Sequence, residues 1–172
     1  KGQIEQGIEH YQQALKVSPD HADTHNNLGV ALVQQGRVDE AAQHYLYALR
    51  IKPSNPEVHN NLGNALLRLE KVQMAVEHYR EALRIKPDYA EANYNLGNTL
   101  FLQNRIAEAI ECFNKAVQIK PDYILAHYNL GNCLAQQGKR EDAARHFRMT
   151  VNSKSNPALA KAAQRALDDL YP

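Results

Sequence analysis

The chain has 172 residues, of which 44% are hydrophobic and 23% are charged, a length that suits one ordinary domain with a sizeable core. Twenty basic and nineteen acidic residues give a formal charge of +1, which argues against the broad basic surface of a nucleic-acid-binding protein. Two cysteines are too few for a disulfide framework, and no apolar run of about 18 residues could span a membrane. These figures favour a soluble, cytoplasmic chain with free thiols.

A period of 34 residues organises the chain. Leu-Gly pairs recur at this step, at Leu28-Gly29, Leu62-Gly63, Leu96-Gly97 and Leu130-Gly131. Four further columns keep the same step: Leu32, Leu66, Leu100 and Leu134; Ala41, Ala75, Ala109 and Ala143; Tyr45, Tyr79, Phe113 and Phe147; Pro19, Pro53, Pro87 and Pro121. Five coincident columns at one period indicate a repeat architecture.

Each repeat contains two apolar stripes at helical spacing. In one repeat, Leu62, Leu66 and Leu69 form the first stripe, and the second stripe occupies residues 72–83. The pattern predicts two antiparallel helices whose small glycine and alanine columns let the backbones approach, while Tyr79 fills the space beside them. The two helices meet at residues that we expect in the left-handed conformation, which Glu tolerates less easily than Gly or Asn: Gly36, Glu70, Asn104 and Gly138.

The repeats also carry signals for the ends of their helices. The proline column is expected to end each second helix, because proline cannot continue the helical hydrogen bonding. Asp20, Asp88 and Asp122 are predicted to cap the first helix that follows. In one repeat Asn55 takes this role, with Pro56 at the first helical position.

The two ends of the chain depart from the period. Lys1 falls at the fourteenth position of a repeat, so the leading segment is expected to be a second helix without its first, cut from something longer. A stripe after Asn156-Pro157 predicts a C-terminal helix with a polar outer face, which would cap the stack. The predicted division is one continuous domain with a truncated repeat at 1–21, repeats at 22–55, 56–89, 90–123 and 124–157, and a capping helix at 158–172.

The columns Leu-Gly, Leu, Ala, Tyr/Phe, Ala and Pro resemble the tetratricopeptide repeat (TPR) from residue 1 to about 155. Their style is similar to the repeats of the O-linked N-acetylglucosamine transferase. The resemblance implies an all-α, right-handed superhelical solenoid of antiparallel helix pairs, whose first helices line a concave groove that receives an extended peptide. The chain departs from the family pattern where Trp, Ala or Pro is common: His25, His59, Asn93 and His127; Thr150; Ser155.

The histidines fall in two columns, which are His10, His44, His78 and His146, and His25, His59 and His127. Equivalent residues on successive helix pairs should lie about 10 Å apart or more, because packed helices lie 8–10 Å apart. A metal ion needs its ligands within roughly 2 Å. We therefore expect packing or partly exposed histidines and no metal site.

Other chemistry is equally sparse. Cys133 shares a column with Ala31, Ala65 and Thr99, which predicts a buried, unreactive thiol. No glycine-rich phosphate loop, Cys-x-x-Cys pair or nucleophile elbow is present. We expect no catalytic residue and no cofactor, and hence a chain that is not an enzyme.

Asparagines recur in the middle of the first helices, although Asn is only a middling helix former. A carboxamide offers a donor and an acceptor, which suits a peptide backbone whatever its side chains. Asn beside Leu-Gly is also common in the family, so family background with helix–helix hydrogen bonding remains the alternative explanation. The predicted peptide-binding residues are Asn27, Asn60, Asn61, Asn64, Arg68, Tyr94, Asn95, Asn98, Phe101, Tyr128, Asn129 and Asn132.

Affinity requires more than these amides. A net hydrogen bond contributes about 0.5–1.5 kcal/mol, whereas micromolar affinity corresponds to about 8 kcal/mol. Tyr94, Phe101 and Tyr128 are the expected apolar anchors, so the last two full repeats are predicted to form the stronger half of the groove. Arg68 is the lone basic residue on the predicted face, which argues against a clamp for C-terminal carboxylates.

The sequence therefore predicts a protein–protein interaction module that binds an extended peptide or partner segment. Two alternatives stay open. The chain could be the substrate-recognition arm of a larger enzyme such as a glycosyltransferase, or a scaffold that self-associates. The self-association hypothesis rests on Ile4, Ile8, Tyr11 and Leu15, which we expect to lack cover in the leading half repeat.

Overall fold

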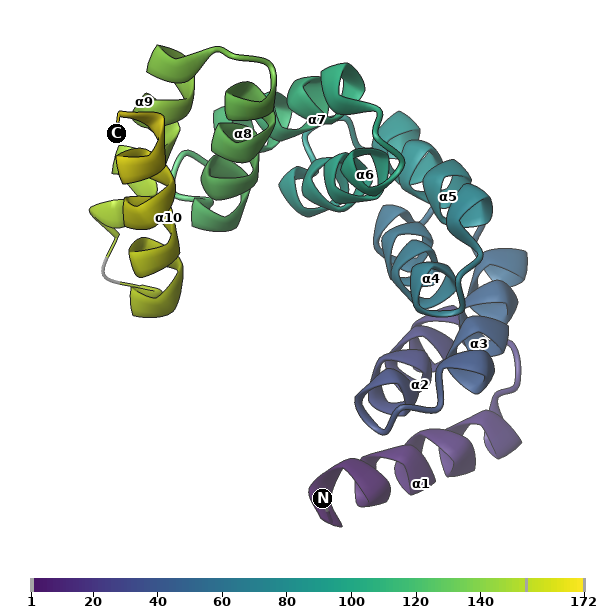
Figure 1. Cartoon of the computed structure of the whole chain (residues 1–172). Helices are drawn as coiled ribbons and strands as arrows, with labels where there is room; N and C mark the ends of the chain where they lie inside the picture. The colour runs from purple at the N-terminus through teal and green to yellow at the C-terminus, as the bar shows by residue number, and fades with distance from the viewer. Residues whose placement is uncertain (1, 154, 172) are drawn as a thin grey trace. The chain divides into compact units, whose positions relative to one another are not determined.

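The structure is a computed structural model that describes residues 2–153 and 155–171. Lys154 and the outermost residues of the predicted first and last segments, Lys1 and Pro172, lie outside the described residues. Every regular element in the described part of the chain is an α-helix (Figure 1). None of these helices is long and apolar enough to cross a membrane.

The chain divides into two compact units, Lys1–Pro87 and Asp88–Pro172, each of which has its own helices. The first unit contains α1 (Gly2–Val17), α2 (Ala22–Gln34), α3 (Val38–Ile51), α4 (Pro56–Arg68) and α5 (Val72–Ile85). The second unit contains α6 (Ala90–Leu102), α7 (Ile106–Ile119), α8 (Ile124–Gln136), α9 (Arg140–Val151) and α10 (Pro157–Leu170).

Helices pack mainly against their neighbours in the sequence. The pairs α2–α3, α4–α5, α6–α7 and α8–α9 make the most extensive contacts. The first helices of these pairs begin at Ala22, Pro56, Ala90 and Ile124, so the helix pairs keep the 34-residue step of the sequence. Within the units, α3 also packs on α4 and α7 on α8, which brings successive first helices into contact, α2 with α4 and α6 with α8.

An aromatic ring packed against a glycine forms the centre of each pair. Tyr45, Tyr79, Phe113 and Phe147 are all at most 2% exposed. A Cβ atom built on Gly63 would lie 2.6 Å from Cε1 of Tyr79, and the other three pairs repeat this approach at 2.6–2.7 Å. The glycine column therefore gives the ring its space, as the sequence predicts.

The turns inside the pairs also follow the prediction. Gly36 and Gly138 have φ of 80° and 73°, and Glu70 and Asn104 both have φ of 59°. In each turn the next amide N–H donates back into the last helical turn, as Lys71 N does to Leu66 O at 2.9 Å. The left-handed residue thus closes the first helix and starts the chain into the second.

The predicted helix caps are correct in only one repeat. Asn55 Oδ1 accepts hydrogen bonds from the backbone N–H groups of Glu57 and Val58, as expected. The predictions for Asp20, Asp88 and Asp122 are wrong, because the N-cap residue of each helix is the next one along. The observed N-cap residues are His21, Tyr89 and Tyr123, and of these only the His21 side chain accepts a capping hydrogen bond, from Thr24 N.

The terminal helices are packed into their units. Ile8 of α1 is 4% exposed, and Ile4, Tyr11 and Leu15 are half-buried, with α1 lying against α2. The expectation that this stripe lacks cover is therefore wrong. At the other end α10 packs on α9 and α8, as expected for a cap, and its Ala163 is fully buried.

Candidate functional site

A cavity lies between successive first helices in the first unit. It has a volume of about 400 Å³ and receives side chains from the C-terminal half of α2 and from α4, between its middle and its C-terminal end. Asn61, Asn64 and Arg68 of α4 line it beside aliphatic groups and one ring from α3. The other lining residues are Val30, Val33, Gln34, Tyr45 and Leu67.

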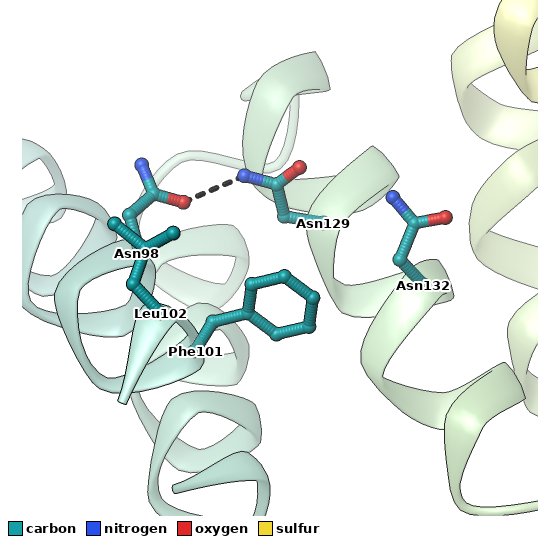
Figure 2. Close-up of a pocket in the computed structure, with 5 residues that line it drawn as sticks. All are labelled: Asn98, Phe101, Leu102, Asn129 and Asn132. Carbon is teal, nitrogen blue, oxygen red and sulfur yellow. Dashed lines mark hydrogen bonds between the residues drawn. The ribbon is translucent and has the colours of Figure 1, made fainter. Parts of the chain in front are cut away.

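A second cavity, of about 290 Å³, lies between α6 and α8 in the second unit. Asn98, Phe101 and Leu102 project from α6, and Asn129 and Asn132 project from α8 (Figure 2). Phe101 is 39% exposed and Leu102 is 73% exposed. This cavity therefore combines amide groups with apolar side chains that solvent or a ligand can reach.

The two cavities are the same structural site in different repeats. Asn98, Phe101 and Leu102 lie two repeats of 34 residues after Val30, Val33 and Gln34. Asn129 and Asn132 are related to Asn61 and Asn64 by the same shift. The repeat geometry produces the cavity, and the residues at these positions make the first copy more polar and the second more apolar.

Asparagine pairs connect the first helices at the edge of each cavity. Asn129 Nδ2 donates to Asn98 Oδ1 at 2.6 Å, as Figure 2 shows. In the first unit Asn61 Nδ2 donates to Asn26 Oδ1 at 3.1 Å. These bonds support the helix–helix role that the sequence left open. The Asn98 amide nitrogen and the Asn129 carbonyl oxygen make no hydrogen bond with any described residue, so they remain available to a ligand.

The Asn64 side chain is hydrogen-bonded to a core residue. The Tyr79 hydroxyl donates to Asn64 Oδ1 at 2.7 Å, and the Tyr79 ring is fully buried against Gly63. The equivalent ring in the second unit is Phe113, which has no hydroxyl, and the equivalent asparagine, Asn98, bonds to Asn129.

Seven of the twelve predicted residues line a cavity, and five do not. Asn60 is only 5% exposed, so its assignment to the groove surface is wrong: position 5 of α4 turns inward, whereas the next residue lines the cavity. Asn27 is exposed but outside both cavities, and Asn95 is half-buried. Tyr94 packs against Phe113 and Tyr128 packs against Phe147, with 6.0 Å between the ring centroids in each case. Neither tyrosine lines a cavity.

The prediction of candidate residues missed six lining residues, which are Val30, Val33, Gln34, Tyr45, Leu67 and Leu102. Leu102 and Gln34 occupy the repeat position of Arg68, and Val33 and Leu67 that of Phe101, so these columns also contained the signal for them. Val30 occupies the repeat position of Asn64 and Asn98. Tyr45 could not be found in this way, because it reaches the cavity from α3 rather than from a first helix.

The two histidine columns meet inside the helix pairs. His25 Nδ1 lies 2.9 Å from His44 Nδ1, and the same contact recurs in two other repeats. The expectation of packing or partly exposed histidines is confirmed, but the comparison of residues within one column did not predict this contact, which joins the two columns. The described residues contain no group of three or more His, Cys, Asp or Glu side chains that could hold a metal ion.

The Cys133 thiol offers little nucleophilic character. Cys133 is fully buried, as its column predicts, and burial raises the pKa of its thiol to about 11. A thiol with so high a pKa is almost entirely protonated at neutral pH and is a poor nucleophile. Cys112 is half-buried and free of any disulfide.

Family models match the chain along most of its length. A model described as TPR repeat matches residues 69–104 and 97–138, and three models described as tetratricopeptide repeat match residues 1–56, 44–77 and 125–153. The chain belongs to the tetratricopeptide repeat family. The TPR assignment agrees with the resemblance in the sequence and with the all-α helix pairs of the structure.

Solved TPR structures share this fold. A crystal structure of MamA superposes with a TM-score of 0.80 at 26% identity, covering 88% of each chain. PilF of Pseudomonas aeruginosa gives a TM-score of 0.84 at 22% identity, covering 98% of this chain and 82% of its own. YrrB, described as a TPR protein with an unusual peptide-binding site, gives 0.76 at 24% identity and covers 95% and 84% of the two chains. No curated protein sequence matches the chain significantly.

The family, the fold and the TPR neighbours together support a protein-interaction module.

Proposed function

We propose that this TPR chain binds an extended peptide segment of a partner protein along its first helices, at the two repeat-equivalent cavities. The observation that carries the proposal is the Asn98–Asn129 pair beside Phe101 and Leu102 at the cavity of the second unit. Under this proposal the chain binds and does not catalyse.

The geometry of the second cavity suits both parts of a peptide. The Asn98 amide nitrogen can donate to a main-chain carbonyl, and the Asn129 carbonyl oxygen can accept from a main-chain N–H. These groups lie on neighbouring helices and are fixed by their mutual hydrogen bond, so little side-chain freedom is lost on binding. Phe101 and Leu102 then offer apolar surface to one side chain of the peptide.

Magnitudes indicate which contacts matter most. Two or three hydrogen bonds contribute about 0.5–1.5 kcal/mol each, and a buried aliphatic or aromatic side chain contributes about 1.5–3 kcal/mol. Micromolar affinity corresponds to about 8 kcal/mol, so one cavity alone supports weak binding. The proposal therefore places the apolar anchor in the second unit, where Phe101 and Leu102 stand in place of Val33 and Gln34.

The double variant Asn98→Ala with Asn132→Ala should bind peptides more weakly than the wild-type chain. A library of random linear peptides is selected on the wild-type chain, and the selected peptides are measured by calorimetry on both proteins. Loss of two amide contacts should weaken binding by about 1–3 kcal/mol, which is on the order of tenfold or more. The selected peptides should share an apolar side chain.

Asn27→Ala is the matched control, because Asn27 occupies the repeat position of Asn129 but is exposed and outside both cavities. It should bind the peptides as the wild type does. If the double variant retained wild-type affinity while folding normally, the asparagines would be structural only and this proposal would be wrong.

A further inference from the structure

Three of the four helix pairs join a histidine of the first helix to a histidine of the second. The Nδ1 atoms lie 2.9 Å apart in His25–His44, 3.0 Å in His59–His78 and 2.9 Å in His127–His146. The first member of each pair is buried at 5–8% exposure, and the second is half-buried. We call these contacts the histidine pairs.

The surroundings fix where the protons lie. The Nε2 atom of each first member lies 2.9 Å from a proline carbonyl oxygen, that of Pro19, Pro53 or Pro121. A carbonyl oxygen only accepts, so this Nε2 carries a proton, and the Nδ1 of the neutral ring has a lone pair. The Nδ1 of the second member must therefore donate. Each neutral pair has a single proton between its two Nδ1 atoms.

This arrangement limits how many protons a pair can gain. The second member can add one proton at its Nε2 and still donate through Nδ1, which gives the pair a charge of +1. A further proton would have to bind the Nδ1 atom of the first member. This atom already accepts the N–H of the second member, whose Nδ1 lies 2.9–3.0 Å away. It would also place two positive charges side by side in a partly buried site, which is strongly unfavourable.

Burial and neighbouring charges both shift the pKa of the second member of each histidine pair. Burial, followed by the charge of the partner imidazole, lowers the pKa of His44, His78 and His146, to about 4 for His146. Nearby carboxylates oppose this shift, but three of them are already paired with arginines. The charged groups around the pairs are Lys16, Arg37 and Glu40; Glu77, Glu81 and Arg84; and Asp142 and Arg145.

We propose that the histidine pairs form an acid-sensitive clasp, in which each folded pair holds at most one added proton whereas the same two histidines hold two in the unfolded chain. The clasp ties each first helix to its second helix and to the proline turn before it. Three of the four first helices that line the cavities, α2, α4 and α8, are held in this way. Mild acid therefore loosens the helix pairs themselves, whatever the partner of the chain is.

The sign follows from proton linkage. The unfolded histidines take up protons as the pH falls through about 6.5, whereas the folded second members resist until a lower pH. The stabilisation is therefore complete above about pH 6.5 and declines as the pH falls below this value, toward pH 4 for the pair that contains His146. Near pH 5 unfolding takes up at least about one extra proton per pair, so the unfolding equilibrium constant rises about tenfold or more per pH unit for each pair.

The α6–α7 pair supplies a natural comparison without imidazole. Asn93 and Cys112 occupy the two histidine positions there, and Asn93 is 2% exposed. Asn93 Nδ2 donates to Tyr89 O at 3.0 Å, within the same first helix and its cap. The α6–α7 pair thus folds with Asn and Cys at the two positions that hold histidines in the other helix pairs.

The test places Asn and Cys at the same two positions of the α4–α5 pair, in the double variant His59→Asn with His78→Cys. Urea unfolding is measured between pH 7 and 5 under reducing conditions, for the wild type and the double variant. We expect the variant to lose stability less steeply, by about tenfold or more in the unfolding constant per pH unit near pH 5. His10→Asn removes an exposed imidazole that belongs to no pair, and the proposal assigns it no change in slope. Equal slopes for the wild type and the double variant would overturn the proposal.

A measurement on the wild type does not depend on the variant folding. Long-range ¹⁵N–¹H correlation spectra at pH 7.5 report which ring nitrogen carries the proton. We expect protonated Nε2 in His25, His59 and His127 and protonated Nδ1 in His44, His78 and His146. Protonated Nε2 with a bare Nδ1 in the second members would contradict the clasp directly.

Discussion

Glu70 occupies the turn between α4 and α5 with φ of 59°, a conformation that Gly adopts freely and that side chains with a Cβ resist. The side chain is exposed, so removing it sacrifices no buried contact. Glu70→Gly relieves a strain of about 1–2 kcal/mol and loses part of this gain to the greater freedom of glycine in the unfolded chain. We expect a net gain of about 0.5–1 kcal/mol in the free energy of unfolding, measured by urea denaturation.

Asn104→Gly is the matched control in the second unit, at the same repeat position and with the same φ of 59°. Asn tolerates the left-handed region better than Glu, so its replacement should yield a smaller gain. A loss of stability in Glu70→Gly would show that the glutamate makes a favourable contact that outweighs its backbone strain.

At the scale of the element, the contact between α4 and α5 depends on the missing side chain of Gly63. A Cβ there would lie 2.6 Å from Cε1 and 2.8 Å from Cδ1 of the fully buried Tyr79, so the ring must move. Overpacking of this kind costs about 1–3 kcal/mol, which exceeds the roughly 0.5–1 kcal/mol that alanine gains over glycine inside a helix. Gly63→Ala should therefore lower the urea midpoint.

Gly7→Ala in α1 separates the two effects. No heavy atom lies within 4 Å of a Cβ built on Gly7, so only the helix preference changes. This variant should be stabilised by about 0.5–1 kcal/mol. If both alanine variants shifted the midpoint in the same direction, the ring-against-glycine account of the core would fail.

The 34-residue period of the sequence predicts some features of the helix pairs and not others. A repeated column identifies residues with the same environment, which is why the leucine, glycine, alanine and aromatic positions could be placed in the core. It does not show which columns touch, so the contact between His25 and His44, nineteen residues apart, was missed. It also cannot resolve one residue of helix rotation, about 100°, which separates buried Asn60 from Asn61 at the cavity.

For the whole molecule, the repeat produces one cavity geometry and the sequence varies its chemistry. The first unit places Gln34 and Arg68 at its cavity, and the second places Phe101 and Leu102 at its own. The asparagine columns could be recognised as surface polar groups from the sequence. Their mutual hydrogen bonds could not, because Asn61 bonds to Asn26 while Asn129 bonds to Asn98, and this choice depends on neighbouring side chains.

The most direct test of the account is an NMR titration of the side-chain amide groups with a peptide selected on the wild-type chain. We predict that the NH₂ signals of Asn98, Asn129 and Asn132 shift as the peptide is added. The signal of Asn27, which is exposed and outside both cavities, should stay in place. Peptide binding with shifts at Asn27 or elsewhere, and none at the three cavity asparagines, would contradict the proposed site.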